Sequence, residues 1–140
     1  MKLAALLIAA SLLLPAFARA GSPSVTVRGF FDALERKDFG RALALTGGDA
    51  SLRITRLLGH IDAEAAQHHA QVEFKVRSLS VEERAPADSG EILVDVSYDI
   101  DVIGKKWIFR KVARKLTGTA QFFVDASAPR IVAIVGSLEP

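Results

Sequence analysis

The chain contains no cysteine, and its 140 residues include one tryptophan and one tyrosine. The lack of cysteine excludes disulfide bonds, thiol nucleophiles and cysteine-ligated metals, so the packing of apolar side chains must stabilise the fold. The sequence also has no glycine-rich phosphate loop and no Gly-x-Ser-x-Gly motif. We therefore expect neither a cofactor nor a metal ion.

Residues 1–20 hold the longest apolar run of the chain and only two charges, both basic. Lys2 precedes an apolar stretch over residues 3–14 that only Ser11 interrupts, and residues 18–20 read Ala-Arg-Ala. This arrangement is typical of a secretory signal peptide that is cleaved after a small-x-small sequence. An uncleaved membrane anchor is disfavoured, because the apolar stretch over residues 3–14 is shorter than the roughly 20 apolar residues that a spanning helix needs.

We expect residues 1–20 to be removed and residues 21–140 to form a single domain, located in the periplasm or secreted. Cleavage takes away Lys2 and Arg19 and no acid from the 18 basic and 16 acidic residues, which leaves 16 of each sign. A neutral mature chain has no net charge to attract nucleic acid or an acidic membrane surface. We also expect no stable membrane anchor after cleavage.

Three helices are expected in the first half of the mature chain. Ser24 is the expected N-cap of the first, and Asp38 that of a short second helix that Gly47-Gly48 ends. A third helix is expected from about Ser51 to His69. Its apolar positions recur at helical spacing: Ile54, Leu57, Leu58, Ile61 and Ala65.

From Gln71 the apolar period changes from helical to twofold, which predicts β-strands. Val72, Phe74 and Val76 share one phase, and the phase then changes, so a β-bulge is expected around residues 77–78. After a turn over residues 86–90, the next strand is expected to run to Ile103, and Ile92, Val94, Val96, Tyr98, Ile100 and Val102 share its apolar face.

Gly104-Lys105 is the expected two-residue turn of a hairpin, because glycine suits the first position of a type II′ turn. The resulting register places Asp99 opposite Arg110 and Asp95 opposite Arg114. It also places Trp107 opposite Val102 and Phe109 opposite Ile100 on the apolar face. A third strand to Val124 and a last strand over residues 131–135 complete a four-stranded meander.

The fold class is therefore α+β, with three N-terminal helices packed on one face of an antiparallel meander. Residues 27–39 read VRGFFDALERKDF, and this segment resembles the opening of nuclear-transport-factor-two-like domains. That superfamily, with its cystatin-like cone, includes the ketosteroid isomerases and polyketide-cyclase-like proteins. Trp107, close after the expected turn, is similar to the pattern those domains show. The resemblance follows the order of elements over the mature chain and implies a strongly curved sheet, with an open end that leads to an apolar pocket.

The resemblance also implies where a ligand or substrate would bind. We expect Phe31, Leu58, Tyr98 and Trp107 to line the pocket. Enzymes of the superfamily use an aspartate base, a tyrosine or protonated aspartate as oxyanion donor, or an aspartate–histidine pair, and Tyr98 is the candidate catalytic residue here. The simpler interpretation is a core tyrosine, because no acid shares its face of the strand.

Two further clusters have structural alternatives that we favour. Asp95, Asp99 and Asp101 are candidates for a general base or a metal site, but their expected arginine partners favour a solvated ladder of ion pairs. His60, Glu64 and His68 lie at four-residue intervals on one helix, a row too extended to hold a single ion. We expect no metal site there.

The outer face of the sheet carries apolar residues as well. Phe122 and Phe123 lie on opposite faces of one strand, and the last strand is apolar on both sides. A homodimer through this face is expected, with Phe123, Val132 and Ile134 in its interface.

The leading functional interpretation is a non-catalytic periplasmic or secreted domain that binds an apolar small molecule or a protein partner in or on its cone. Two alternatives remain open. One is a ketosteroid-isomerase-type isomerase or lyase that uses Tyr98, and the other is a structural subunit of an envelope complex. Fold alone does not choose among them.

Overall fold

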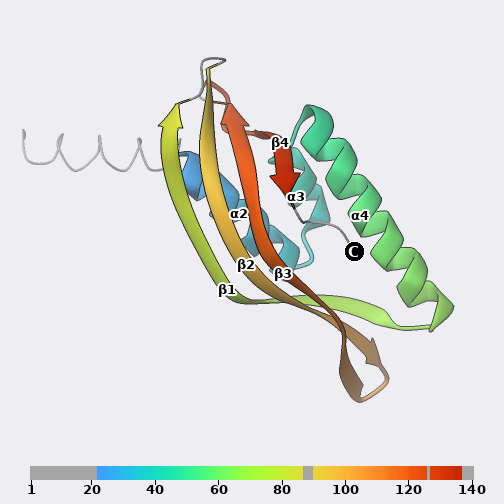
Figure 1. Cartoon of the computed structure of the whole chain (residues 1–140). Helices are drawn as coiled ribbons and strands as arrows, with labels where there is room; N and C mark the ends of the chain where they lie inside the picture. Colours follow the sequence, from blue (N-terminus) through green and yellow to red (C-terminus); the bar gives the residue numbers. More distant parts are fainter. Residues whose placement is uncertain (1–21, 87–89, 126, 137–140) are drawn as a thin grey trace, which may run out of the picture.

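The computed structural model describes residues 22–86, 90–125 and 127–136. The segment expected to be a signal peptide, residues 1–20, and the central residues of the turn expected at 86–90 lie outside these ranges. Within these ranges, three helices precede four strands (Figure 1). They are α2 (Pro23–Glu35), α3 (Phe39–Ala44), α4 (Gly48–Gln67), β1 (Gln71–Pro86), β2 (Glu91–Lys106), β3 (Phe109–Asp125) and β4 (Ile131–Gly136).

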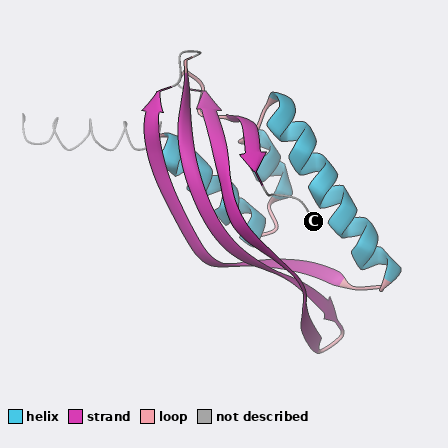
Figure 2. Cartoon of the chain, in the orientation of Figure 1, coloured by secondary structure: helices cyan, strands magenta, loops and turns pink. Residues whose placement is uncertain are grey.

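The strands form one antiparallel sheet in the order β1-β2-β3-β4, which confirms the predicted α+β class and meander. Figure 2 shows the helices gathered on one side of this sheet. Their buried side chains join those of the strands in a single core, whose largest members are Phe30, Phe31 and Phe122. We call the sheet face that contributes to this core the inner face.

Helix α2 begins earlier than the sequence predicted. Its N-cap is Ser22 and not Ser24, since Pro23 has the fixed φ that suits the first helical position. The cap comes from a distant strand: the Glu83 carboxylate accepts hydrogen bonds from Ser22 Oγ (2.9 Å), Ser24 Oγ (2.8 Å) and Ser24 N (3.1 Å). These bonds, led by that of the Ser24 hydroxyl, lower the pKa of Glu83.

Asp38 is the N-cap of α3, as predicted, and its side chain accepts a hydrogen bond from Arg41 N. The prediction that Gly47-Gly48 ends this helix is wrong. Gly47 is instead the N-cap of α4, and Gly48, with φ of 53°, is its first residue. Gly47 has an extended backbone conformation. Its N–H donates to Ile131 O at 2.8 Å, and this hydrogen bond joins the α3–α4 connection to β4.

The predicted phase change in β1 is confirmed. Val76 pairs with Ile100 and Ser78 pairs with Asp99, so Arg77 is the extra residue of a bulge. The bulge lets Val72, Phe74 and Val76 share the inner face with the half-buried Leu79 and Val81. The inner face of β2 is also as predicted, because Val94, Val96, Tyr98, Ile100 and Val102 are all buried.

The predicted β2–β3 turn is wrong. The two turn residues are Trp107 and Ile108, and Lys106 faces Phe109. Gly104 lies within β2 opposite Lys111 and forms no turn. Each expected partner shifts with the turn. Asp99 faces Thr117 and Asp95 faces Gln121, with neither arginine opposite them.

The last strand is held by the helices. Arg53 of α4 donates from Nη1 to Ile134 O at 2.6 Å and from Nη2 to Gly136 O. Ile134 pairs with Phe122 and is buried in the core, so it does not share the outer face with Phe123. Of the three residues expected in a dimer interface, Phe123 and Val132 are half-buried. The homodimer stays a prediction.

Candidate ligand-binding groove

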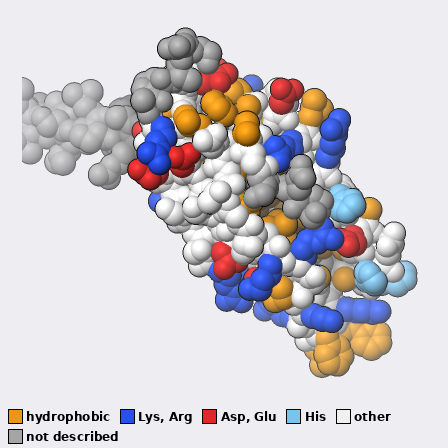
Figure 3. Space-filling view, in the orientation of Figure 1, with side chains coloured by type: hydrophobic (Ala, Val, Ile, Leu, Met, Phe, Trp, Pro, Cys, Tyr) orange, Lys and Arg blue, Asp and Glu red, His pale blue; other side chains and the backbone are white. Residues whose placement is uncertain are grey.

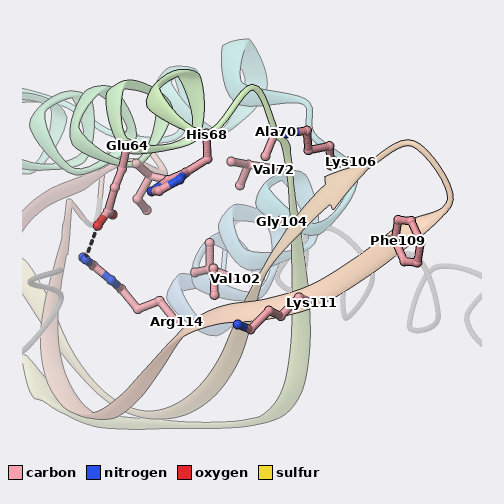
Figure 4. Close-up of a pocket in the computed structure, with 13 residues that line it drawn as sticks. Glu64, His68, Ala70, Val72, Val102, Gly104, Lys106, Phe109, Lys111 and Arg114 are labelled. Carbon is pink, nitrogen blue, oxygen red and sulfur yellow. Dashed lines mark hydrogen bonds and ion pairs between the residues drawn. The ribbon is translucent and has the colours of Figure 1, made fainter.

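A groove of about 350 Å³ lies between the C-terminal half of α4, the start of β1 and the β2–β3 hairpin (Figure 4). We call it the α4–hairpin groove. Its walls are mostly apolar, with charged side chains among them. The lining residues are Ile61, Glu64, Ala65, His68, Ala70, Val72, Val102, Gly104, Lys106, Phe109, Lys111, Ala113 and Arg114.

Small residues create the space. A Cβ atom added to Gly104 would lie 3.9 Å from Ala70 Cβ and 4.0 Å from Ala113 Cβ, which are ordinary contact distances. No larger side chain fills the floor at these three positions. A bulky residue at position 104 would therefore project into the groove without a backbone clash.

A second bulge supplies part of the wall. Val102 pairs with Arg114 and Ile103 pairs with Val112, so Ala113 is an extra residue in β3. The bulge changes the phase of the strand. Lys111 and Phe109 therefore lie on the same side as Arg114 and line the groove with it, as Figure 4 shows.

The charges around the groove are predominantly basic. Arg114 Nη2 donates to Glu64 Oε1 at 3.0 Å, which neutralises the one carboxylate of the lining. Arg114 Nη1 is buried and has no acceptor among the described residues. Lys106 and Lys111 are exposed and form no ion pair with any part of the chain that the structure describes.

A second depression, of about 530 Å³, lies on the other part of the sheet between β1, β2, β3 and the end of β4. It contains the ion pair between Arg84 and Asp95 and has a more polar lining than the α4–hairpin groove. Apolar walls with few polar groups are typical of small-molecule sites. The α4–hairpin groove is therefore the stronger candidate for a ligand.

The four residues expected to line a pocket do not lie together. Phe31 and Tyr98 are both buried in the core, where their rings stack with centroids 6.2 Å apart. Leu58 is half-buried against that core. Trp107 is 86% exposed at the hairpin turn. None of the four lines the α4–hairpin groove.

The acidic residues of β2 have different partners from those predicted. Asp95 pairs with Arg84, and Asp101 is buried between Arg77 Nε (2.7 Å) and Lys115 Nζ (3.4 Å). The hydrogen bond from Arg77 lowers the pKa of Asp101, against the opposing effect of burial, and the Lys115 charge lowers it further.

The arginines expected opposite these acids pair elsewhere, Arg110 with Glu73 and Arg114 with Glu64. Asp99 Oδ1 is buried with no hydrogen-bond donor among the described residues. The solvated ladder of Asp–Arg pairs is therefore wrong in its pairing. The cause is the displaced turn.

His60 and Glu64 lie on α4, His68 is its C-cap, and Glu64 is engaged by Arg114. Within the described ranges, no three histidine or carboxylate side chains are grouped so that they hold a metal ion together. Among the described helices, none has both the length and the apolar character needed to cross a membrane.

The chain was compared with protein-family models, with curated protein sequences and with solved structures, and none of the three comparisons finds a match.

The sequence analysis did not predict the α4–hairpin groove. Its floor residues are Ala70, Gly104 and Ala113, of which Ala70 lies more than thirty residues before the other two, and their small side chains carry no chemical signal. One signal was present: residues 104–115 combine six basic side chains with Trp107 and Phe109.

Proposed function

We propose that residues 21–140 form a non-catalytic periplasmic or secreted binding domain, and that the α4–hairpin groove takes an apolar small molecule with an acidic group. The observation that carries this proposal is a groove with apolar walls and a basic rim. Its volume of about 350 Å³ falls within the roughly 300–1,000 Å³ of small-molecule sites. The secreted location rests on the signal sequence in residues 1–20.

The proposed architecture is the cone of nuclear-transport-factor-two-like domains. Bulges bend strands and increase their twist. The sheet has register shifts in β1 at Val76/Ser78, in β3 opposite Val102/Ile103 and in the β3–β4 ladder at Phe123/Val124. Together with three helices on one face, these shifts support a strongly curved sheet whose open end holds the groove.

Binding is favoured over an isomerase or lyase because the groove lining contains neither an aspartate nor a tyrosine. Tyr98 is buried beside Phe31 and is not part of the lining. Glu64, the one acid of the lining, is neutralised by Arg114. A general base needs a proton to abstract within hydrogen-bond reach in a site that also binds the substrate. Turnover that is lost in Tyr98→Phe, while the fold is kept, would revive the enzymatic alternative.

The test measures binding of three twelve-carbon probes by calorimetry: dodecanoate and dodecyltrimethylammonium below their micelle concentrations, and dodecanol below its solubility limit. Dodecanoate should bind at least about tenfold more tightly than the cation, because Lys106 and Lys111 attract a carboxylate. A preference for the cation, or no binding of any probe, contradicts the proposal.

The groove itself is tested by Gly104→Leu, whose side chain would occupy the floor. Dodecanoate binding should weaken by at least about tenfold. The matched control is Gly59→Ala, an exposed glycine of α4 with no atom within 4 Å of an added Cβ. Equal affinity of the Gly104→Leu variant and the control would place the ligand elsewhere.

A further inference from the structure

The tip of the β2–β3 hairpin exposes three consecutive large apolar residues. Trp107, Ile108 and Phe109, which we call the hairpin tip, are 86%, 88% and 69% exposed. Figure 1 shows that this hairpin extends beyond the helices and the rest of the sheet. In the same orientation, Figure 3 shows a group of apolar side chains at that end, bordered by Lys and Arg. Exposed apolar patches of this kind mark interaction sites.

The turn itself departs from the usual choice of residues. Trp107 has a φ of 58°, a left-handed conformation that glycine and asparagine adopt far more readily than a bulky residue. The side chain contributes little to the fold, because most of it is in solvent. An exposed tryptophan in a costly backbone conformation points to a role outside the folded core.

The charges behind the hairpin tip have one sign. Residues 104–115 contain six Lys and Arg and no Asp or Glu. Three of them are neutralised in part by acids elsewhere: Arg110 by Glu73, Arg114 by Glu64 and Lys115 by Asp101.

The other three, Lys105, Lys106 and Lys111, form no ion pair with a described residue. The balanced total of the mature chain thus conceals a local excess of positive charge at one end. This excess lies where the apolar side chains are exposed.

We propose that the hairpin tip inserts into the interfacial region of a lipid bilayer that contains anionic phospholipids. Tryptophan is enriched at the boundary between acyl chains and headgroups, and lysines just behind it attract acidic headgroups. Lysine stems lie along apolar surface while their ammonium groups stay in water. Three apolar residues give reversible docking and not an anchor.

A bilayer fits this surface better than a single-stranded nucleic acid does. Bases stack on aromatic rings, but the most exposed residue of the tip is the aliphatic Ile108. Ile108, between two aromatic residues, can pack among the acyl chains of a bilayer without a specific stacking partner. The positive charge of the three lysines favours a bilayer with acidic headgroups over a neutral one.

The docking would also place the α4–hairpin groove at the membrane. Lys106, Phe109 and Lys111 line the groove and belong to the same hairpin. A bound amphipathic acid would then exchange directly with the lipid surface. This consequence rests on the proposed function, whereas the docking does not.

The chain provides its own probe, because Trp107 is its single tryptophan. The protein is purified from a secreting host, and its N-terminus is checked by mass spectrometry. It is then titrated with large vesicles of phosphatidylglycerol and phosphatidylcholine in equal parts, or of phosphatidylcholine alone. The emission should shift to shorter wavelength with the acidic vesicles. The apparent affinity should fall at 1 M salt, where the Debye length is only about 3 Å.

Two variants keep the probe in place. Ile108→Asp should weaken vesicle binding by at least about tenfold, whereas the matched control Leu52→Asp, at an exposed apolar position on α4, should not. Replacing Lys105, Lys106 and Lys111 by Gln should weaken it by about fivefold for each lysine. The control that removes the same charge elsewhere replaces Arg28, Arg56 and Lys75.

Four results would overturn the proposal. One is no shift with acidic vesicles while circular dichroism shows a folded protein, and another is equal binding by Ile108→Asp and Leu52→Asp. A shift caused by oligothymidylate but not by vesicles would assign the surface to nucleic acid. A shift that grows with protein concentration alone would assign it to a second copy. Gly104→Leu separates the two proposals, because it should bind vesicles normally.

Discussion

Phe122 and Phe123 are adjacent phenylalanines on opposite faces of β3, and truncating each to alanine tests the layered core. Phe122 has no exposed surface, and its ring centroid lies 5.8 Å from that of Phe31 and 6.2 Å from that of Phe30. Phe123 is half-buried on the outer face, where it pairs with Leu93 and Ala133. The two substitutions remove the same atoms from different environments.

The two losses should differ about threefold. Truncating a fully buried phenylalanine costs about 3–5 kcal/mol, because the cavity forms among side chains that collapse only in part. Because Phe123 is only half-buried, its truncation should lose roughly half of the free energy gained by burying a phenylalanine side chain, about 1–1.5 kcal/mol. A domain of this size changes its Tm by about 4 °C per kcal/mol. Phe122→Ala should therefore lower Tm by roughly 12–20 °C and Phe123→Ala by roughly 4–6 °C.

The measurements are thermal unfolding for Tm and urea unfolding for the free energy, both followed by far-ultraviolet circular dichroism at several protein concentrations. Tryptophan fluorescence is a poor probe of unfolding here, because Trp107 is already exposed in the folded state. Equal losses of stability in Phe122→Ala and Phe123→Ala would refute the conclusion that only the inner face of the sheet packs into the core. A Phe123→Ala loss that grows with protein concentration would instead show that a second copy covers the outer face.

Three further predictions concern single positions. Gly59→Ala should raise the free energy of unfolding by about 0.5–1 kcal/mol in urea titrations, since this exposed helical glycine has open space around it, and a loss would refute that. Gly136→Ala should lower it by about 1–3 kcal/mol, because φ is 119° and the new Cβ would lie 2.9 Å from Thr119 O, whereas an unchanged urea midpoint would contradict the close approach. Asp101→Asn should destabilise the protein at pH 7, because it removes the charge shared by Arg77 and Lys115. The pKa of Asp101 is lowered on folding, so its contribution is present above the unfolded pKa of about 3.9 and is lost as pH falls through the folded value. The difference between Asp101→Asn and the unchanged protein should thus shrink from pH 7 to pH 3, and a constant difference would refute this account.

Patterns with a strict period predicted the fold well. The twofold alternation in β2 and the phase change at Arg77 both survive in the structure, because a shift of one residue would expose an entire buried face. The turn at Gly104 failed for a different reason. Glycine permits a turn but does not require one, and here its missing side chain leaves room for the α4–hairpin groove.

The candidate site was harder to predict than the fold. Phe31 and Tyr98 were expected in a pocket because they are aromatic and lie on apolar faces, yet they fill the core together. A filled core and an open cone share the same apolar periodicity, and only side-chain volumes in three dimensions distinguish them. The groove depends on the bulge at Ala113. The segment around it, residues 104–115, is short and basic and has no apolar period from which the bulge could be predicted.

The position of β4 has a consequence for the order in which the chain folds. Ile131 accepts a hydrogen bond from Gly47 and donates one to Leu45, and Arg53 binds the carbonyls of Ile134 and Gly136. A chain that emerges N-terminus first releases these helical partners roughly eighty residues before β4 arrives. Contacts of such long sequence separation form late. The carboxyl end of α3 and the side of α4 therefore stay incompletely paired until β4 has been synthesised. Cooperative closure of the core must wait until β4 is available to pair with these elements.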